Sequence, residues 1–267
     1  MGDEAEGRAW QVGVWDRMSE LYWNEVDRRF APVIDRVISL ADLQAGERVL
    51  DLGTGTGAAA EKAAPAVEPG GGVLAVDISP EMLAVAERRA AQARFGYQVA
   101  EGSAESIPAA DASLDVILAS LSLMYVIDRA DAAREMARVL KPGGRLVASA
   151  WAGPDRCDLV LFQETAGRFA PAPPVSGVGP GALADPQPFL EELARAGMEA
   201  QVETDVVEFE FDDFASAWRV FAGVTAATLT RERKQQAKAA IQDLMWPDPT
   251  QPRTFRNGVL YIIGRRQ

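Results

Sequence analysis

The first forty residues carry apolar side chains at helical spacing. Trp10, Val14, Met18 and Leu21 recur at intervals of three or four residues, which predicts a helix over residues 8–30. Pro32 follows, and proline is tolerated in the first turn of a helix. The pattern therefore predicts two helices ahead of the first strand, the second of them beginning at Pro32.

From residue 48 onward, short apolar segments alternate with helical patterns. Strands are expected over residues 48–52, 73–77, 97–100, 114–120 and 145–150, with helices over 58–66, from 80 onward and over 130–140. Strands that alternate with helices in this way form right-handed crossover units. They build a parallel sheet that is covered on both faces.

The last third of the chain follows another pattern. Residues 171–188 hold six prolines and three glycines and predict a long loop, with a helix over 189–196 after it. Alternation over 202–211 predicts a strand, and residues 213 to about 245 are expected to be helical. A final strand over 255–263, broken at Asn257-Gly258, has no crossover helix of its own and is expected to be antiparallel.

Composition removes several kinds of chemistry from consideration. The 267 residues include no histidine, which excludes a Ser-His-Asp triad, a Cys-His pair and an HExxH zinc site, so no metal is expected. A single cysteine excludes an internal disulfide and suits a reducing cytoplasm. A net charge of −12 argues against nucleic acid or an anionic membrane as a partner. Neither a signal peptide nor a membrane span is expected.

Three closely spaced glycines follow the first predicted strand. Gly53, Gly55 and Gly57 let the backbone approach a ligand and direct the N–H groups of the next helix toward it. Asp77 ends the following strand, 20 residues beyond Gly57. A carboxylate at that place can accept hydrogen bonds from both ribose hydroxyls of an adenosine. The two features together indicate a nucleoside cofactor.

The glycine loop by itself fits two kinds of cofactor. Gly53-x-Gly55-x-x-Ala58 also matches the dinucleotide pattern, so an NAD(P)-dependent oxidoreductase stays open at this point. Asp51 lies two residues before Gly53. A carboxylate there favours a cationic ammonium group and opposes a pyrophosphate, which makes a dinucleotide the weaker alternative.

Five segments, in this order, resemble the class I S-adenosylmethionine-dependent methyltransferases, within the small-molecule branch that includes the ubiquinone/menaquinone C-methyltransferases. They are VLDLGTGTG (49–57), AVDISPEML (75–83), EGSAESIP (101–108), SLDVILAS (113–120) and REMARVLKPGGRLVASAW (134–151). The resemblance implies an α/β fold with a doubly wound, mostly parallel seven-stranded sheet and an antiparallel last strand. It also implies a helical lid over residues 1–45, a cofactor-binding core over 46–151 and a C-terminal part over 152–267, with pocket insertions at about 152–188 and 212–250.

The resemblance also assigns residues to the cofactor, S-adenosyl-L-methionine. Asp51 and the glycine loop would hold the methionine part, Asp77 the ribose, and Ile78 and Met82 the adenine. The family usually has Asp where Ser103 stands, and a hydroxyl accepts a hydrogen bond more weakly than a carboxylate. The full set of expected cofactor contacts is Asp51, Gly53, Thr54, Gly55, Gly57, Asp77, Ile78, Met82, Ser103, Ala104 and Ser120.

The methyl group of this cofactor is already activated, so the protein has to align an acceptor and exclude water. The segment after the fourth strand, residues 121–128, is largely apolar and favours a hydrophobic acceptor. Tyr22 and Tyr125 are candidate catalytic hydroxyls, with aromatic packing as the alternative reading. Candidate walls of the substrate pocket, for which core packing is the alternative, are Trp15, Trp23, Met124, Trp151 and Phe162.

The expected activity is methyl transfer to a C, O or N atom of a small, hydrophobic, specialised metabolite, by a monomer or homodimer. A second reading keeps the cofactor as a scaffold for cyclisation or binding, and an oxidoreductase is a remote third. The missing histidines remove the commonest base for deprotonating a phenol or alcohol. They favour transfer by proximity, or a tyrosine or carboxylate as base.

Overall fold

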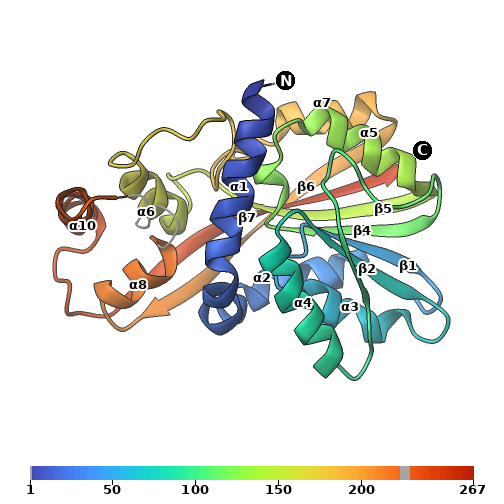
Figure 1. Ribbon diagram of the computed structural model, residues 1–267, viewed down its shortest axis with the longest axis horizontal. Coiled ribbons are helices and arrows are strands. Elements are labelled where there is room, and N and C mark those ends of the chain that lie inside the picture. Colours follow the sequence, from blue (N-terminus) through green and yellow to red (C-terminus); the bar gives the residue numbers. More distant parts are fainter. Residues whose placement is uncertain (1, 223–228) are drawn as a thin grey trace.

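A seven-stranded sheet forms the centre of the computed structural model, which describes residues 2–222 and 229–267. The strand order is β3-β2-β1-β4-β5-β7-β6 (Figure 1). Strands β1 to β5 pair in parallel, whereas β7 is antiparallel to both β5 and β6, which confirms the expected sheet. The strands are β1 (Arg48–Leu52), β2 (Gly72–Asp77), β3 (Gln98–Glu101), β4 (Leu114–Ser120), β5 (Leu140–Trp151), β6 (Met198–Phe211) and β7 (Arg253–Arg266).

Helices cover both faces of the sheet, with α2, α3 and α4 on one side and α5 and α7 on the other (Figure 1). Ser79, Asp128, Asp213 and Thr230 each begin a helix by accepting a hydrogen bond from a backbone N–H in its first turn. The helices are α1 (Gly2–Leu21), α2 (Asp27–Ala41), α3 (Ala58–Val67), α4 (Pro80–Gln92), α5 (Arg129–Val139), α6 (Asp158–Gly167), α7 (Gln187–Arg195), α8 (Phe214–Phe221) and α10 (Arg231–Met245), with a 3-10 turn η2 (Leu123–Tyr125).

The N-terminal segment differs from the prediction of two helices. It is one helical stretch from Gly2 to Ala41 whose only change of winding is the π-helical turn η1 (Tyr22–Val26). Pro32 lies inside α2, so its prediction as a helix start is wrong. Proline removes one backbone hydrogen bond, but burial of the apolar face of α2 offsets that loss. The buried residues of this face are Phe30, Val33, Ile34, Val37 and Ala41.

The final strand also differs, because β7 continues without a break through Asn257 and Gly258. Asn257 is fully buried, and its Oδ1 accepts the N–H of Leu159 at 2.8 Å. A side chain at Gly258 would place its Cβ 2.9 Å from the carbonyl oxygen of Arg156. The two residues therefore join β7 to the start of α6. A pair that predicts a turn from sequence instead lets the backbone of β7 lie close to the backbone at Arg156.

The remaining C-terminal predictions fall into two groups. The long loop is confirmed, since residues 168–186 contain neither helix nor strand. The single helix expected from Asp213 to about Met245 is instead two helices, α8 and α10; residues 223–228 between them lie outside the described part of the chain.

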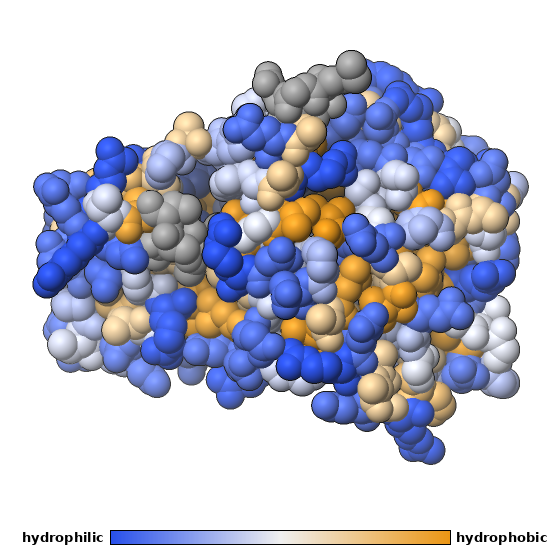
Figure 2. Space-filling view, viewed as in Figure 1, coloured by the Kyte–Doolittle hydropathy of each residue, from blue (hydrophilic) through white to orange (hydrophobic). Residues whose placement is uncertain are grey.

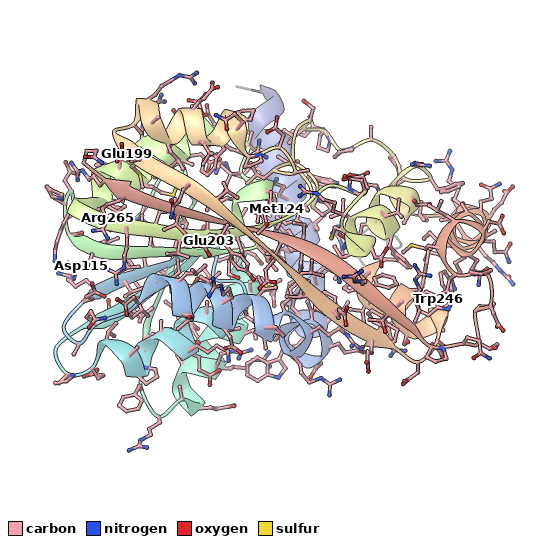
Figure 3. All side chains as sticks on the ribbon, turned by 180° about the vertical axis from the view of Figure 1, so that it is seen from behind. Asp115, Met124, Glu199, Glu203, Trp246 and Arg265 are labelled. Atoms are coloured by element: carbon pink, nitrogen blue, oxygen red, sulfur yellow. The ribbon has the colours of Figure 1, made fainter. Side chains whose placement is uncertain are left out.

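The surface is mostly polar on the face shown in Figure 2, with apolar side chains visible in its middle. Seen from behind, Glu199 and Glu203 lie along β6 at the sheet edge, and Trp246 lies near the far ends of β6 and β7 (Figure 3). Within residues 2–222 and 229–267, no helix has the length and apolar content needed to cross a membrane.

The strand order fixes where a ligand can bind. After β3 the chain returns past β1 to form β4 on its other side, so the direction of winding reverses between β1 and β4. Ligands of doubly wound sheets bind in the crevice that this reversal leaves at the carboxyl ends of the strands.

Candidate active site

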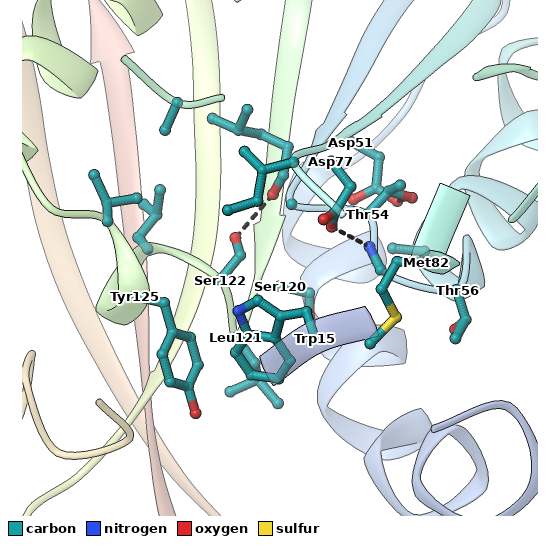
Figure 4. A pocket seen from close by; sticks show the side chains of 18 of the residues that line it. Trp15, Asp51, Thr54, Thr56, Asp77, Met82, Ser120, Leu121, Ser122 and Tyr125 are labelled. Carbon is teal, nitrogen blue, oxygen red and sulfur yellow. Dashed lines mark hydrogen bonds between the residues drawn. The ribbon is translucent and has the colours of Figure 1, made fainter. Parts of the chain in front are cut away.

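A pocket lies at the carboxyl ends of β1 and β4, beneath α1 (Figure 4). Including its open mouth, it encloses about 1150 Å³ of empty space. Trp15, Tyr22 and Tyr125 line it. It also contains ten of the eleven predicted cofactor residues, namely Asp51, Gly53, Thr54, Gly55, Asp77, Ile78, Met82, Ser103, Ala104 and Ser120.

The glycine loop has the backbone conformation that its sequence predicts. Gly53, Gly55 and Gly57 have φ angles of 69°, 54° and 83°, a left-handed region that costs other residues about 1 kcal/mol or more. A Cβ at Gly53 would lie 2.5 Å from the Cβ of Ser122, so only glycine fits between β1 and the turn after β4. Gly57 does not line the pocket; it is the residue before α3 and supports the loop from outside.

Asp51 holds the loop from below. Its Oδ2 accepts hydrogen bonds from the Thr54 hydroxyl at 2.6 Å and from the Ala60 N–H at 2.9 Å. Burial raises the pKa of this carboxyl to about 6, against the effect of both hydrogen bonds. A cation bound in the pocket would favour the ionised form of Asp51. The carboxylate is therefore suited to a positively charged ligand group.

Asp77 connects the loop with the start of α4. One oxygen accepts the Gly55 N–H at 2.8 Å, shown in Figure 4, and the other accepts the Ser79 N–H at 3.0 Å. Burial raises its pKa. The Ser79 hydroxyl in turn donates to Asp16 of α1 at 2.6 Å. The N-terminal helix is thus docked on the turn that follows Asp77, the residue predicted to bind the ribose.

Aromatic rings form the opposite wall of the pocket. The Trp15 ring meets Tyr125 at 4.7 Å and Tyr22 at 5.9 Å, measured between ring centroids and with the rings nearly perpendicular. Burial raises the pKa of both tyrosine hydroxyls. At neutral pH both are therefore neutral phenols, which can donate or accept a hydrogen bond but do not supply a phenolate base.

The turn after β4 is held in a strained conformation beside the glycine loop. Leu121 has a φ of 54°, unusual for a residue with a side chain. Its N–H donates to the carbonyl and the hydroxyl oxygen of Ser149, at 3.1 and 3.0 Å. The Ser122 hydroxyl donates to the Leu52 carbonyl at 2.8 Å (Figure 4). These bonds fix the backbone of residues 120–122 against the loop, where the resemblance places the cofactor's amino end.

Four predicted wall residues lie elsewhere. The Trp23 ring packs 4.6 Å from the Arg89 guanidinium, and Met124 is buried in the core. Trp151 packs against Phe30 at 5.3 Å, and Phe162 belongs to an aromatic cluster near the tips of β6 and β7. None of these four lines the pocket, and core packing, the alternative reading, describes all but Trp23, which is only partly buried.

Several pocket residues were missed by sequence reasoning. Arg8 and Gln11 reach the pocket from α1, where Arg8 pairs with Glu105 at 3.4 Å and Gln11 donates to the Tyr125 carbonyl at 2.7 Å. Residues 8, 11, 15 and 22 lie three, four and seven positions apart, on one helix face. That spacing was the sequence signal that could have predicted Arg8 and Gln11 as pocket residues. Thr56 also lines the pocket and lies within the predicted glycine loop, whereas Asp27, which lines it too, had no comparable local signal.

The residues present fit a nucleoside that carries a positive charge. The glycine loop admits a ligand close to the backbone, Asp77 is held where ribose hydroxyls can donate to it, and Asp51 favours a cation. Within the described ranges no group of three or more metal-binding side chains is found.

Known proteins match the chain in both sequence and fold. The methyltransferase domain family matches residues 50–148. A 27-O-demethylrifamycin SV methyltransferase of Amycolatopsis mediterranei is 31% identical over 243 residues, which cover 90% of this chain and 84% of that protein. A ubiquinone/menaquinone biosynthesis C-methyltransferase of Ectopseudomonas mendocina is 38% identical over 130 residues, 48% of this chain and 51% of that one.

The crystal structure of YcgJ from Bacillus subtilis superposes with a TM-score of 0.65 at 22% identity, covering 88% of this chain and 97% of that one, and shows the fold. The sequence match to a methyltransferase over most of both chains decides between a methyltransferase and a dinucleotide-dependent oxidoreductase, in favour of the former. The chain belongs to the class I S-adenosylmethionine-dependent methyltransferases, and S-adenosylmethionine is its cofactor.

Proposed function

We propose that this methyltransferase acts on a small, hydrophobic, specialised metabolite, bound between the cofactor and the aromatic side of the pocket. The observation that carries the proposal is the single cavity in which Trp15, Tyr22 and Tyr125 face the glycine loop and Asp77. The walls of this cavity away from the loop are mainly apolar or aromatic. The named activity of the rifamycin relative, which covers most of this chain, supports a natural-product acceptor.

In this proposal the bound cofactor supplies an activated methyl group. Asp77 accepts hydrogen bonds from the ribose, while Ile78, Met82 and Ala104 pack against the adenine. Ser103 accepts from the adenine edge. Asp51 and the backbone of Gly53 to Gly55, with that of Ser120, surround the methionine part. All of these residues line the pocket.

The chain contributes alignment and exclusion of water more than proton transfer. Tyr22 and Tyr125 carry neutral hydroxyls that can orient a polar group of the acceptor. Asp27 is hydrogen-bonded to Thr56 and paired with Arg89, and Asp51 and Asp77 hold backbone N–H groups. The carboxylates nearest the cofactor are thus already engaged. This supports transfer to an acceptor that needs little help in losing a proton, with proximity as the main source of rate.

The test is transfer of a labelled methyl group from S-adenosylmethionine to a panel of hydrophobic phenols, alcohols, amines and prenylated compounds. Labelled product together with S-adenosylhomocysteine is the expected result. Product that forms without label and without consumption of cofactor would instead indicate cyclisation on a cofactor scaffold. Activity confined to charged, hydrophilic acceptors would contradict the hydrophobic substrate class.

A further inference from the structure

Two ion pairs join the N-terminal helical segment to neighbouring arginines of α4. Glu20 pairs with Arg88 at 2.5 Å, and both side chains are more than half exposed. Asp27 pairs with Arg89, and both side chains are at least 84% buried, with 16% and 14% exposed. An exposed pair adds little to stability. The buried pair must overcome the cost of removing two charges from water.

The buried pair also holds the glycine loop. Asp27 Oδ2 accepts the hydroxyl of Thr56 at 2.7 Å as well as the Arg89 guanidinium. Arg89 Nε donates to the carbonyl of Thr56 at 2.8 Å, and its Nη1 donates to Glu61 at 2.9 Å. Thr56 lies between Gly55 and Gly57, so both its side chain and its backbone are fixed from outside the loop.

The position of this network connects it to the lid. Asp27 is the first residue after the π-turn η1, the one place where the winding of the N-terminal helix changes. Trp23, on that turn, lays its ring over Arg89 and shields the pair from water. Tyr22, on the same turn, lines the pocket together with Asp27 and Thr56.

Simple attachment of two helices would not require this arrangement. Apolar residues of similar size commonly replace a buried ion pair with no loss of stability. Burial raises the pKa of Asp27 even with Thr56 and Arg89 beside it, so ionisation of this carboxyl is disfavoured where it lies. A carboxyl group whose ionisation is disfavoured is nevertheless placed in contact with Thr56 of the loop, which indicates a role in the loop's geometry.

We propose that Asp27 is a positioning residue for cofactor binding. It holds Thr56, and through Thr56 the glycine loop, in the conformation in which the Gly55 N–H donates to Asp77. It thereby couples the docking of the N-terminal helical lid to the binding of S-adenosylmethionine. It acts through the loop and touches no reacting atom. The inference rests on the proposed placement of the cofactor on this loop.

The test compares Asp27→Asn with Glu20→Gln, which removes the charge of the exposed pair on the same helical segment. Each full-length variant is titrated with S-adenosylhomocysteine, and its unfolding is followed separately. Asp27→Asn is expected to raise the dissociation constant about tenfold and to raise KM for S-adenosylmethionine while kcat at saturation is largely kept. Glu20→Gln is expected to bind like the wild type. Equal affinity of the two variants would overturn the proposal.

A second pair of variants separates positioning from general loosening and serves if Asp27→Asn fails to fold. Thr56→Val removes the hydroxyl at nearly constant volume, and Thr56→Ser keeps it. Weak binding by the first with recovery by the second is expected, and Asp27→Asn combined with Thr56→Val should bind no more weakly than the weaker single variant. Additive losses, or no difference between the two Thr56 variants, would contradict the coupling. Failure of the wild type to bind would instead contradict the cofactor site itself.

Discussion

The two halves of the core are packed from different side chains. Between residues 48 and 150 the fully buried apolar residues are alanine, valine, leucine, isoleucine and methionine, whereas the rings of Phe95, Tyr97 and Tyr125 are only partly buried. From residue 151 onward the described core contains ten buried rings beside its aliphatic residues: Trp151, Phe162, Phe189, Phe209, Phe211, Phe214, Phe221, Trp246, Phe255 and Tyr261.

The difference follows from what each half has to do. Small side chains let α3 approach the strands closely, which the glycine loop requires; Ala60 and Ala63 of that helix are fully buried. Beyond β5, α6 and α8 pack against the long β6–β7 pair through large rings, such as Phe162 against Phe255 at 5.8 Å. The family match over residues 50–148 covers only the first half. All eleven residues expected to contact the cofactor lie in this first half, so we expect the cofactor to constrain that half closely and the other half mainly to supply stability and shape.

The variant expected to distinguish the two halves most strongly is Phe255→Ala. Removing this fully buried ring should lower the free energy of unfolding by about 3–5 kcal/mol, because it leaves a cavity among its aromatic neighbours. The affinity of the folded protein for S-adenosylhomocysteine should change little. Denaturant unfolding and calorimetric titration measure the two effects. Val206→Ala, at a half-exposed position of β6, is the control. A large loss of affinity in Phe255→Ala would contradict the comparison.

Asp77→Ala should show the converse behaviour. The change removes the proposed ribose acceptor and the partner of the Gly55 N–H, so the dissociation constant for S-adenosylhomocysteine should rise about 100-fold, equivalent to roughly 2.7 kcal/mol. Glu101→Ala, at the register partner of Asp77 on β3, removes an exposed carboxylate and should bind normally. Equal losses in both variants would mean that general charge, and not this position, governs binding.

Acidification should weaken cofactor binding. The pKa of Asp51 is raised to about 6 in the free protein, and a bound cation lowers it, so binding releases a proton below that pH. One pH unit below the pKa only about a tenth of the carboxyl is ionised, hence affinity at pH 5 should be about tenfold lower than at pH 7.5. Titrations across this range measure it. Asp51→Asn should flatten the profile; an unchanged slope in that variant would assign the titration to another group, such as Asp77.

The smallest effect is expected from Tyr125→Phe. Losing one hydrogen bond to an acceptor is worth about 1 kcal/mol, so kcat/KM should fall roughly fivefold while cofactor affinity is kept. Tyr261→Phe is a matched change in the part of the core from residue 151 onward. The buried Tyr261 hydroxyl has no hydrogen-bond partner among the described residues. That variant should retain full activity. If both variants behave alike, the Tyr125 hydroxyl plays no part in orienting the acceptor.

The parts that sequence could predict are those in which a local pattern has one physical meaning. A strand that ends in spaced glycines and another that ends in Asp77 predicted a ligand site at this edge of the sheet, and ten of the eleven expected contacts line the pocket found there. Asp27 and Arg89 lie 62 residues apart, so their pairing depends on how the start of α2 docks against α4. Trp151 and Phe162 look alike in sequence whether they line a cavity or fill a core. At Asn257-Gly258 a turn signal was overridden by tertiary packing.

Because the N-terminal helix is continuous, its first half would move as a rigid rod about the π-turn η1. Gly7 lies 15 residues before Tyr22, about 22 Å at 1.5 Å per residue. A bend of about 20° at the π-turn, a size common at such irregularities, would displace the Gly7 end by about 8 Å. The Tyr22 ring beside the pivot would shift far less. A small rotation at one turn would thus move Arg8 and Gln11, which line the pocket from α1, much further than Tyr22.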